Sequence, residues 1–126
     1  KGVSKYILEA YRLCRERDIR FMVVFVPEKY RVYHDLDNFE LGTEELRSWR
    51  VNDLPSRLKQ ALTALAPDIE YVDLTPALKE ESRKGIATYL SDDTHWTVAG
   101  HRVAAEAMHR ALSTPVVQRL VRMKNP

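Results

Sequence analysis

The sequence has little of what marks several common protein classes. Its 126 residues contain one cysteine, Cys14, so no disulfide can form within the chain. The longest apolar run, residues 21–26, is too short to cross a bilayer, and the first residues lack the charged and then apolar order of a signal peptide. Any targeting segment is therefore expected outside this chain. The net charge of +2, from 20 basic and 18 acidic residues, gives no field that favours nucleic acid as a partner.

The composition is that of a soluble globular protein with a core. The chain is 44% hydrophobic and 30% charged, and its length suits one domain spanning residues 1–126. Apolar residues recur every three to four positions over residues 4–17, which predicts an amphipathic helix. Residues 20–26 are then continuously apolar after Arg20, which predicts a fully buried strand of a parallel sheet with helices on both faces.

The remaining elements alternate in the same way. In chain order we expect a loop with a short helix (28–52), a helix capped by Asp53 (54–65), a strand (69–74), a helix opened by Thr75 and Pro76 and ended at Gly85, a strand end (86–90) and a helix (97–112). This order predicts a three-layer α/β/α fold with a small parallel sheet. With so few strands, we expect an exposed sheet edge through which the chain forms a homodimer.

The segment SDDTHWTVAG, residues 91–100, carries the chemistry. A carboxylate two or three positions before His95 suits an acid that orients an imidazole, so that the ring acts as a general base toward a hydroxyl. The segment leads from a predicted strand end into a helix, where ligands of open α/β sheets gather. No serine elsewhere in the chain stands in a strand-to-helix turn that would complete a triad. The sequence therefore predicts part of a larger enzyme.

This segment resembles the last block of the SGNH (GDSL-type) hydrolases and their O-acetyltransferase relatives. The likeness rests on DDTHW followed by Gly100 and His101, with weaker support from FVPEKYRVY and VDLTPAL. It implies a partial SGNH, flavodoxin-like fold, of which this chain is the C-terminal portion. It also implies a catalytic His95, oriented by Asp93 in an Asp-x-His-Trp form or by Asp92 in an Asp-x-x-His form; the tryptophan favours Asp93.

The resemblance further implies acyl transfer or hydrolysis on an ester, an O-acetyl group on a carbohydrate, with no metal or organic cofactor and outside the cytoplasm. The candidate substrate-binding residues are Trp96 of the same block and Lys29, which follows a predicted strand and is placed to steady an anionic group. The family's serine block and its Gly-x-Asn-Asp block are absent from this chain. We therefore expect this chain by itself to be inactive.

Two other interpretations remain open. The first is a non-catalytic module that uses residues 28–52, with the aromatic residues Tyr30, Tyr33, Phe39 and Trp49, to contact a glycan or a protein. The second is a metal site formed by Asp92, Asp93, His95 and His101. The second is disfavoured, because the chain has no HExxH motif and adjacent acids seldom converge on one ion.

Overall fold

The computed structural model describes residues 2–36 and 48–113. The chain forms two compact units, which we call unit 1 and unit 2. Unit 1 comprises Lys1–Pro27 and Asp37–Asp73, and unit 2 comprises Glu28–Leu36 and Leu74–Pro126. Part of the expected loop over residues 28–52, including Phe39, lies outside the described residues.

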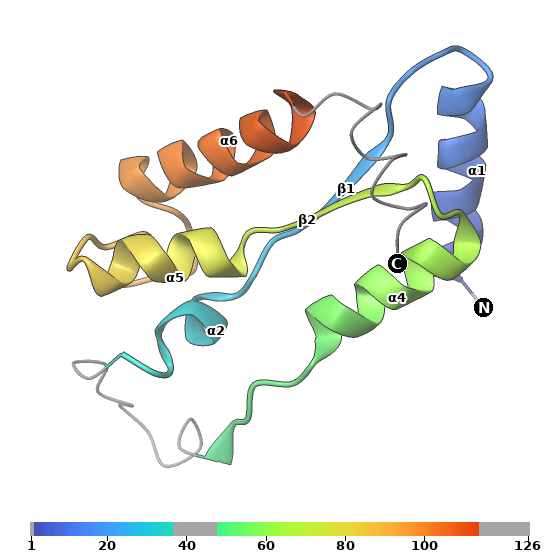
Figure 1. Ribbon diagram of the computed structural model, residues 1–126. Helices are drawn as coiled ribbons and strands as arrows, with labels where there is room; N and C mark the ends of the chain where they lie inside the picture. Colours follow the sequence, from blue (N-terminus) through green and yellow to red (C-terminus); the bar gives the residue numbers. More distant parts are fainter. Residues whose placement is uncertain (1, 37–47, 114–126) are drawn as a thin grey trace, which may run out of the picture. The chain divides into compact units, whose positions relative to one another are not determined.

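Unit 1 contains the sheet and two helices. Its elements in chain order are α1 (Val3–Arg15), β1 (Met22–Phe25), α4 (Leu54–Leu65) and β2 (Glu70–Asp73) (Figure 1). The two strands are parallel, with Val24 opposite Val72. The prediction of an α/β protein with a small parallel sheet is therefore confirmed.

The core of unit 1 forms where α1 and α4 contact each other and α4 contacts β2. Four buried residues make it up: Tyr11, Leu62, Ala66 and Ile69. The hydroxyl of Tyr11 donates to Asp68 Oδ2 at 2.5 Å, so the aromatic ring is buried while its polar end keeps a partner.

One local expectation for unit 1 is wrong, and a second is met only in part. All four residues of β1 are only partly buried, and Val26 is 57% exposed, because a sheet with two described strands gives each strand one neighbour. Asp53 holds the N-cap position of α4 as expected, but its side chain makes no capping hydrogen bond, and Asn52 Oδ1 accepts from the backbone N–H of Leu54 instead.

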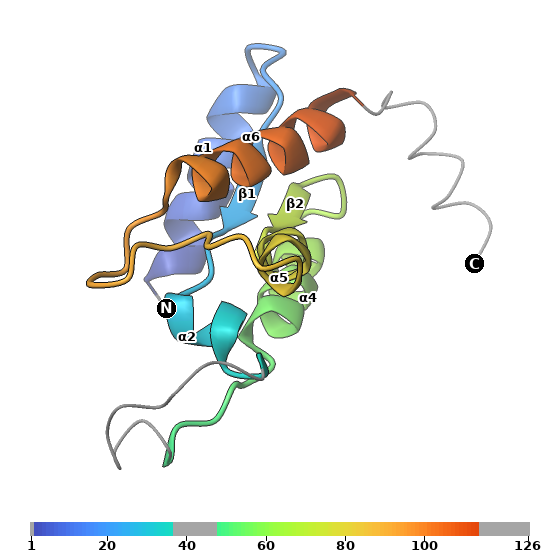
Figure 2. The same cartoon turned by 90° about the vertical axis from the view of Figure 1, so that its left-hand side faces the viewer.

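Unit 2 is built from three helices and the segment that carries the DDTHW block. The helices are α2 (Lys29–Tyr33), α5 (Thr75–Arg83) and α6 (Val98–Ser113). Helix α5 contacts both α2 and α6, and the two views show α5 and α6 side by side (Figures 1 and 2). Leu74 and Leu78 of this unit are fully buried.

Three boundaries of unit 2 bear on the site. Leu74, rather than Thr75, holds the N-cap position of α5, whereas Gly85 ends the helix as expected, with a φ of +84° that suits glycine. Residues 86–90 do not form a strand of the sheet, and Tyr89 makes instead an isolated antiparallel bridge with Trp96.

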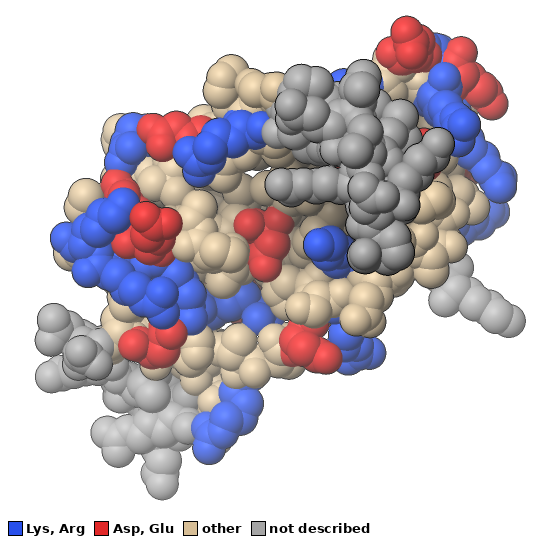
Figure 3. Space-filling view, viewed as in Figure 1, with Lys and Arg blue, Asp and Glu red and all other residues tan. Residues whose placement is uncertain are grey.

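Acidic and basic side chains lie next to one another on the face shown in Figure 3, in keeping with the small net charge.

Candidate active site

The DDTHW block lies in a loop whose two ends are tied together. Besides the bridge between Tyr89 and Trp96, Leu90 N donates to His95 O at 2.9 Å and Thr97 N donates to Thr88 O at 3.0 Å. The segments before and after the turn are thus held side by side. Asp93 and His95 lie in this turn, between α5 and α6 in the chain.

One carboxylate holds both the backbone and the ring of His95. Asp93 Oδ1 accepts from the backbone N–H of His95 at 2.7 Å, and Asp93 Oδ2 lies 3.1 Å from His95 Nδ1. The side chain of His95 is 82% exposed. Within the described residues, no serine hydroxyl contacts the ring, and Nε2 has no hydrogen-bond partner. This nitrogen is therefore open to a reacting group.

Asp93 is ionised at neutral pH. The hydrogen bond from the backbone N–H of His95 is the main cause that holds the pKa of Asp93 below its ordinary value; loss of solvation opposes it, and the His95 ring and the charge of Lys29 add smaller lowering effects. A carboxylate in this state accepts from Nδ1 and fixes the tautomer in which Nε2 carries the lone pair.

The structure pairs Asp93, and not Asp92, with His95. Asp92 is exposed, and no hydrogen bond or ion pair joins it to the ring. His101 packs edge-on against Trp96, with ring centroids 5.4 Å apart. In the described part of the chain, no group of three His, Cys, Asp or Glu side chains is arranged to hold a metal ion.

Lys29 lies at the loop, where its ammonium donates to three backbone carbonyls. Its Nζ is 2.5 Å from Leu90 O, 2.9 Å from Ser91 O and 3.2 Å from Asp93 O. The predicted role of Lys29 in binding an anionic substrate stays a prediction, and these contacts point to another use of its charge.

Trp96 is partly buried and serves as a packing centre for the loop. Its ring meets that of Tyr89 edge-on at 6.5 Å, and Tyr89 in turn meets Tyr33 at 5.8 Å. A role of Trp96 in substrate binding stays a prediction. Of the other aromatic residues proposed for a sugar surface, Tyr30 packs against His34, and Trp49 is 43% exposed.

Helix α6 begins at the loop through a cap and a close backbone contact. Thr97 Oγ1 accepts from Gly100 N at 3.1 Å and donates to Ala87 O at 2.7 Å. A Cβ on Gly100 would lie 2.1 Å from Thr88 O, so only glycine allows the first turn of α6 to approach residue 88. The glycine that follows the DDTHW block therefore has a packing reason.

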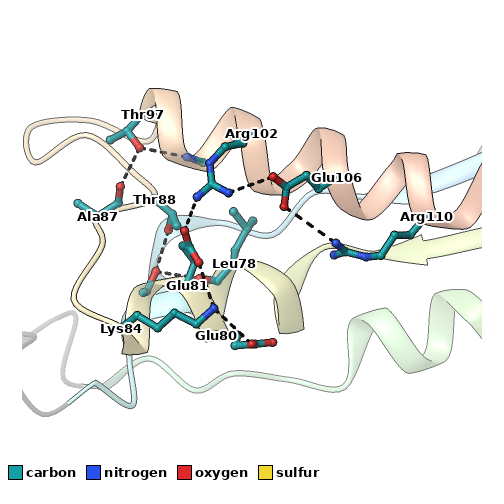
Figure 4. Close-up of polar contacts among 12 residues, drawn as sticks. Leu78, Glu80, Glu81, Lys84, Ala87, Thr88, Thr97, Arg102, Glu106 and Arg110 are labelled. Atoms are coloured by element: carbon teal, nitrogen blue, oxygen red, sulfur yellow. Dashed lines mark hydrogen bonds and ion pairs between the residues drawn. The ribbon is translucent and has the colours of Figure 1, made fainter.

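A network of charges joins α5 and α6 behind the loop (Figure 4). Glu81 on α5, whose side chain is 12% exposed, pairs with Arg102 on α6 and lies 3.3 Å from Lys84 Nζ. Arg102 also donates to Glu106 at 3.0 Å. The two helices that flank the loop are thus joined by an ion pair between a largely buried carboxylate and a half-exposed guanidinium.

Sequence reasoning missed the roles of Tyr33 and Thr88. The hydroxyl oxygen of Tyr33 accepts from the backbone N–H groups of Thr88 and Tyr89 at 2.8 and 2.9 Å. A signal was present in the sequence, since Lys29 and Tyr33 are four residues apart in FVPEKYRVY and so share one face of a helical turn. The sequence does not show which segment that face meets.

None of the helices in the described part of the chain is long and apolar enough to span a bilayer.

Searches of curated proteins and of solved structures find no match to this chain. A family model described as "SGNH hydrolase-like domain, acetyltransferase AlgX" matches residues 3–124, nearly the whole sequence. The expected relation to SGNH hydrolases and O-acetyltransferases is confirmed, and the chain belongs to this AlgX-type SGNH hydrolase-like family.

Proposed function

We propose that Asp93 and His95 form the base of an acyl-transfer site that acts on esters, and specifically on O-acetyl groups of a polysaccharide. The observation that carries the proposal is the double contact of the Asp93 carboxylate with His95, which orients the ring and leaves Nε2 open. Membership of the acetyltransferase family supports the reaction class. An extracytoplasmic site of action, and the two units as parts of one domain, belong to the same proposal.

In the proposed reaction the nucleophile is a serine outside this segment. Its hydroxyl oxygen attacks the ester carbonyl carbon, and its proton passes to Nε2 of His95. The ionised Asp93 stabilises the imidazolium, which then gives the proton to the departing alcohol as the ester bond breaks. An acceptor hydroxyl or water attacks the acyl-serine and gives its proton to His95, which returns it to the serine oxygen as the acyl–serine bond breaks. No step needs a metal or an organic cofactor.

The test is hydrolysis of p-nitrophenyl acetate by the full-length protein. His95→Ala removes the base, and we expect kcat to fall by about 10²–10⁴-fold. Asp93→Asn is expected to approach the same loss, because an amide that presents its N–H to Nδ1 favours the wrong tautomer. Asp92→Asn is the matched control, since Asp92 makes no contact with the ring, and its kcat should stay within about twofold of the unmodified protein.

Turnover that is unaffected by His95→Ala would contradict the proposal and favour the alternative, a binding module that contacts a glycan or a protein. Equal losses in the two aspartate variants would refute the assignment of Asp93. The homodimer expected from an exposed sheet edge stays a prediction.

A further inference from the structure

Helix α2 presents two side chains to the segment that leads into the DDTHW block. Lys29 and Tyr33 are its first and last residues, one helical turn apart. Together they bond five backbone groups of residues 88–93. Tyr33 accepts from the N–H groups of Thr88 and Tyr89, and Lys29 donates to the carbonyls of Leu90, Ser91 and Asp93. Irregular backbone of this kind needs such partners, because it has no regular ladder of its own.

The hydrogen-bonding capacity of both side chains is used within the protein. The ammonium of Lys29 has three hydrogens, and three carbonyls accept them. The Tyr33 oxygen accepts from two N–H groups, which matches its acceptor capacity.

The hydroxyl proton of Tyr33 also has a partner. Ser82 Oγ donates to Leu78 O at 2.8 Å, so the hydroxyl of Thr88 must donate to Ser82 at 2.9 Å. Thr88 Oγ1 is then the acceptor for the Tyr33 hydroxyl, 3.3 Å away. A chain of hydroxyls with one possible direction thus ties α2 through residue 88 to α5.

Helix α2 is itself held in place. A helix of five residues is not stable by its own hydrogen bonds. Val32 is fully buried, and Asp35, just beyond the helix, pairs with Lys79 at 2.8 Å and Arg83 at 3.1 Å on α5. The two side chains therefore project from a fixed support.

We propose that Lys29 and Tyr33 are positioning residues, a clamp that fixes residues 88–93 so that Asp93 can hold His95. The inference rests on the proposed function for its catalytic meaning, while the clamp itself is a statement about the loop. Lys29 bonds the carbonyl of Asp93, the residue whose carboxylate orients the ring. Its charge serves the loop backbone rather than a substrate.

The first test is hydrogen exchange measured by mass spectrometry on the full-length protein. Lys29→Met keeps the length of the side chain and removes its donors, and Tyr33→Phe removes only the hydroxyl. In each variant we expect amides in residues 86–96 to exchange at least about tenfold faster, because Lys29→Met removes three hydrogen bonds to the segment and Tyr33→Phe removes two. Amides of α5 report whether unit 2 remains folded and should be unchanged.

Matched controls are Lys5→Met and Tyr6→Phe on the exposed face of α1 in unit 1, and both should exchange as the unmodified protein does. Unchanged exchange at residues 86–96 in either clamp variant would overturn the proposal. If one variant unfolds, the other still decides, because Lys29 and Tyr33 bond different groups of the segment.

The second test separates positioning from substrate binding. With p-nitrophenyl acetate, Lys29→Met should lower kcat by about 10–100-fold and leave KM unchanged, because the base is misplaced while the substrate contacts remain. A raised KM at unchanged kcat would overturn the clamp in favour of substrate binding. If His95→Ala leaves turnover intact, the proposed function fails, and the exchange experiment still decides whether the clamp exists.

Discussion

Replacement of Gly100 by alanine tests the packing of α6 on the active-site loop. In most helices this change stabilises, by about 1 kcal/mol at an interior position, because alanine restricts the unfolded chain and favours the helix. Here the added methyl would lie 2.1 Å from Thr88 O, 3.1 Å from the carbonyl carbon of Thr88 and 3.0 Å from Trp96 Cβ. Two of these three atoms belong to the backbone, so no rotamer change relieves the clash.

The cost of the clash, compared with the gain in helix propensity, decides whether Gly100→Ala destabilises or stabilises the protein. The helix and residue 88 must separate by about 1 Å to restore van der Waals contact, and overpacking of this kind costs about 1–3 kcal/mol. Thr88 O also accepts from Thr97 N, so the same displacement weakens the bond that closes the loop. After subtraction of the gain in helix propensity, we expect Gly100→Ala to lower the free energy of unfolding by up to about 2 kcal/mol.

Urea and thermal unfolding of the full-length protein measure this change. The control is Ala105→Gly on the exposed face of α6, which should cost about 1 kcal/mol through helix propensity alone. A stabilisation by Gly100→Ala of about 1 kcal/mol, which helix propensity alone would give, would refute the argument that backbone contact requires glycine here. We also expect kcat for p-nitrophenyl acetate to fall, because the loop that carries His95 is displaced.

Two further predictions concern charges of unit 2. Glu81→Gln should lower the thermal midpoint by a few degrees, because the largely buried carboxylate of Glu81 loses its charge-assisted contacts with Arg102 on α6 and with Lys84. Glu80→Gln, at a side chain 74% exposed, should change it little, and equal shifts in the two variants would contradict this account. The free energy of unfolding should also decrease as the pH is lowered. Hydrogen bonds from Lys84 and then Arg102 lower the pKa of Glu81, and the N–H of His95 lowers that of Asp93. The stability that these carboxylates add is present at neutral pH and is lost as the pH falls below about 4, through their pKa values in the folded state. Urea midpoints measured from pH 7 to pH 3 check this, and Asp93→Asn should make the decline shallower.

The fold class was open to prediction because it depends on local periodicity. The apolar residues of α1 and α6 recur at helical spacing, and the Val-rich run that contains β1 has the composition of a strand. The degree to which a strand is buried could not be predicted from local periodicity. The expectation of a fully buried strand over residues 20–26 was wrong, because burial depends on the neighbours a strand acquires, and composition does not specify these.

The pairing of Asp93 with His95 follows the sequence closely, because a contact between residues two apart is set by local geometry. The choice between Asp92 and Asp93 needed coordinates, since the two spacings differ by one residue and both are chemically reasonable. The contacts of Lys29 and Tyr33 could not be predicted from the sequence for another reason. Their partners lie 61 and 55 residues further along the chain, and a hydrogen bond to backbone leaves no mark in the partner's side chains.

The sequence by itself determined the α/β class, the positions of most helices and the chemical block at residues 91–100, because each depends on residues close together in the chain. Tertiary structure alone decided how that block is held. The clamp from α2, the contact that requires Gly100 and the ion pair of Glu81 with Arg102 all join segments distant in sequence. Such contacts depend on the packing of whole elements, which no single segment encodes.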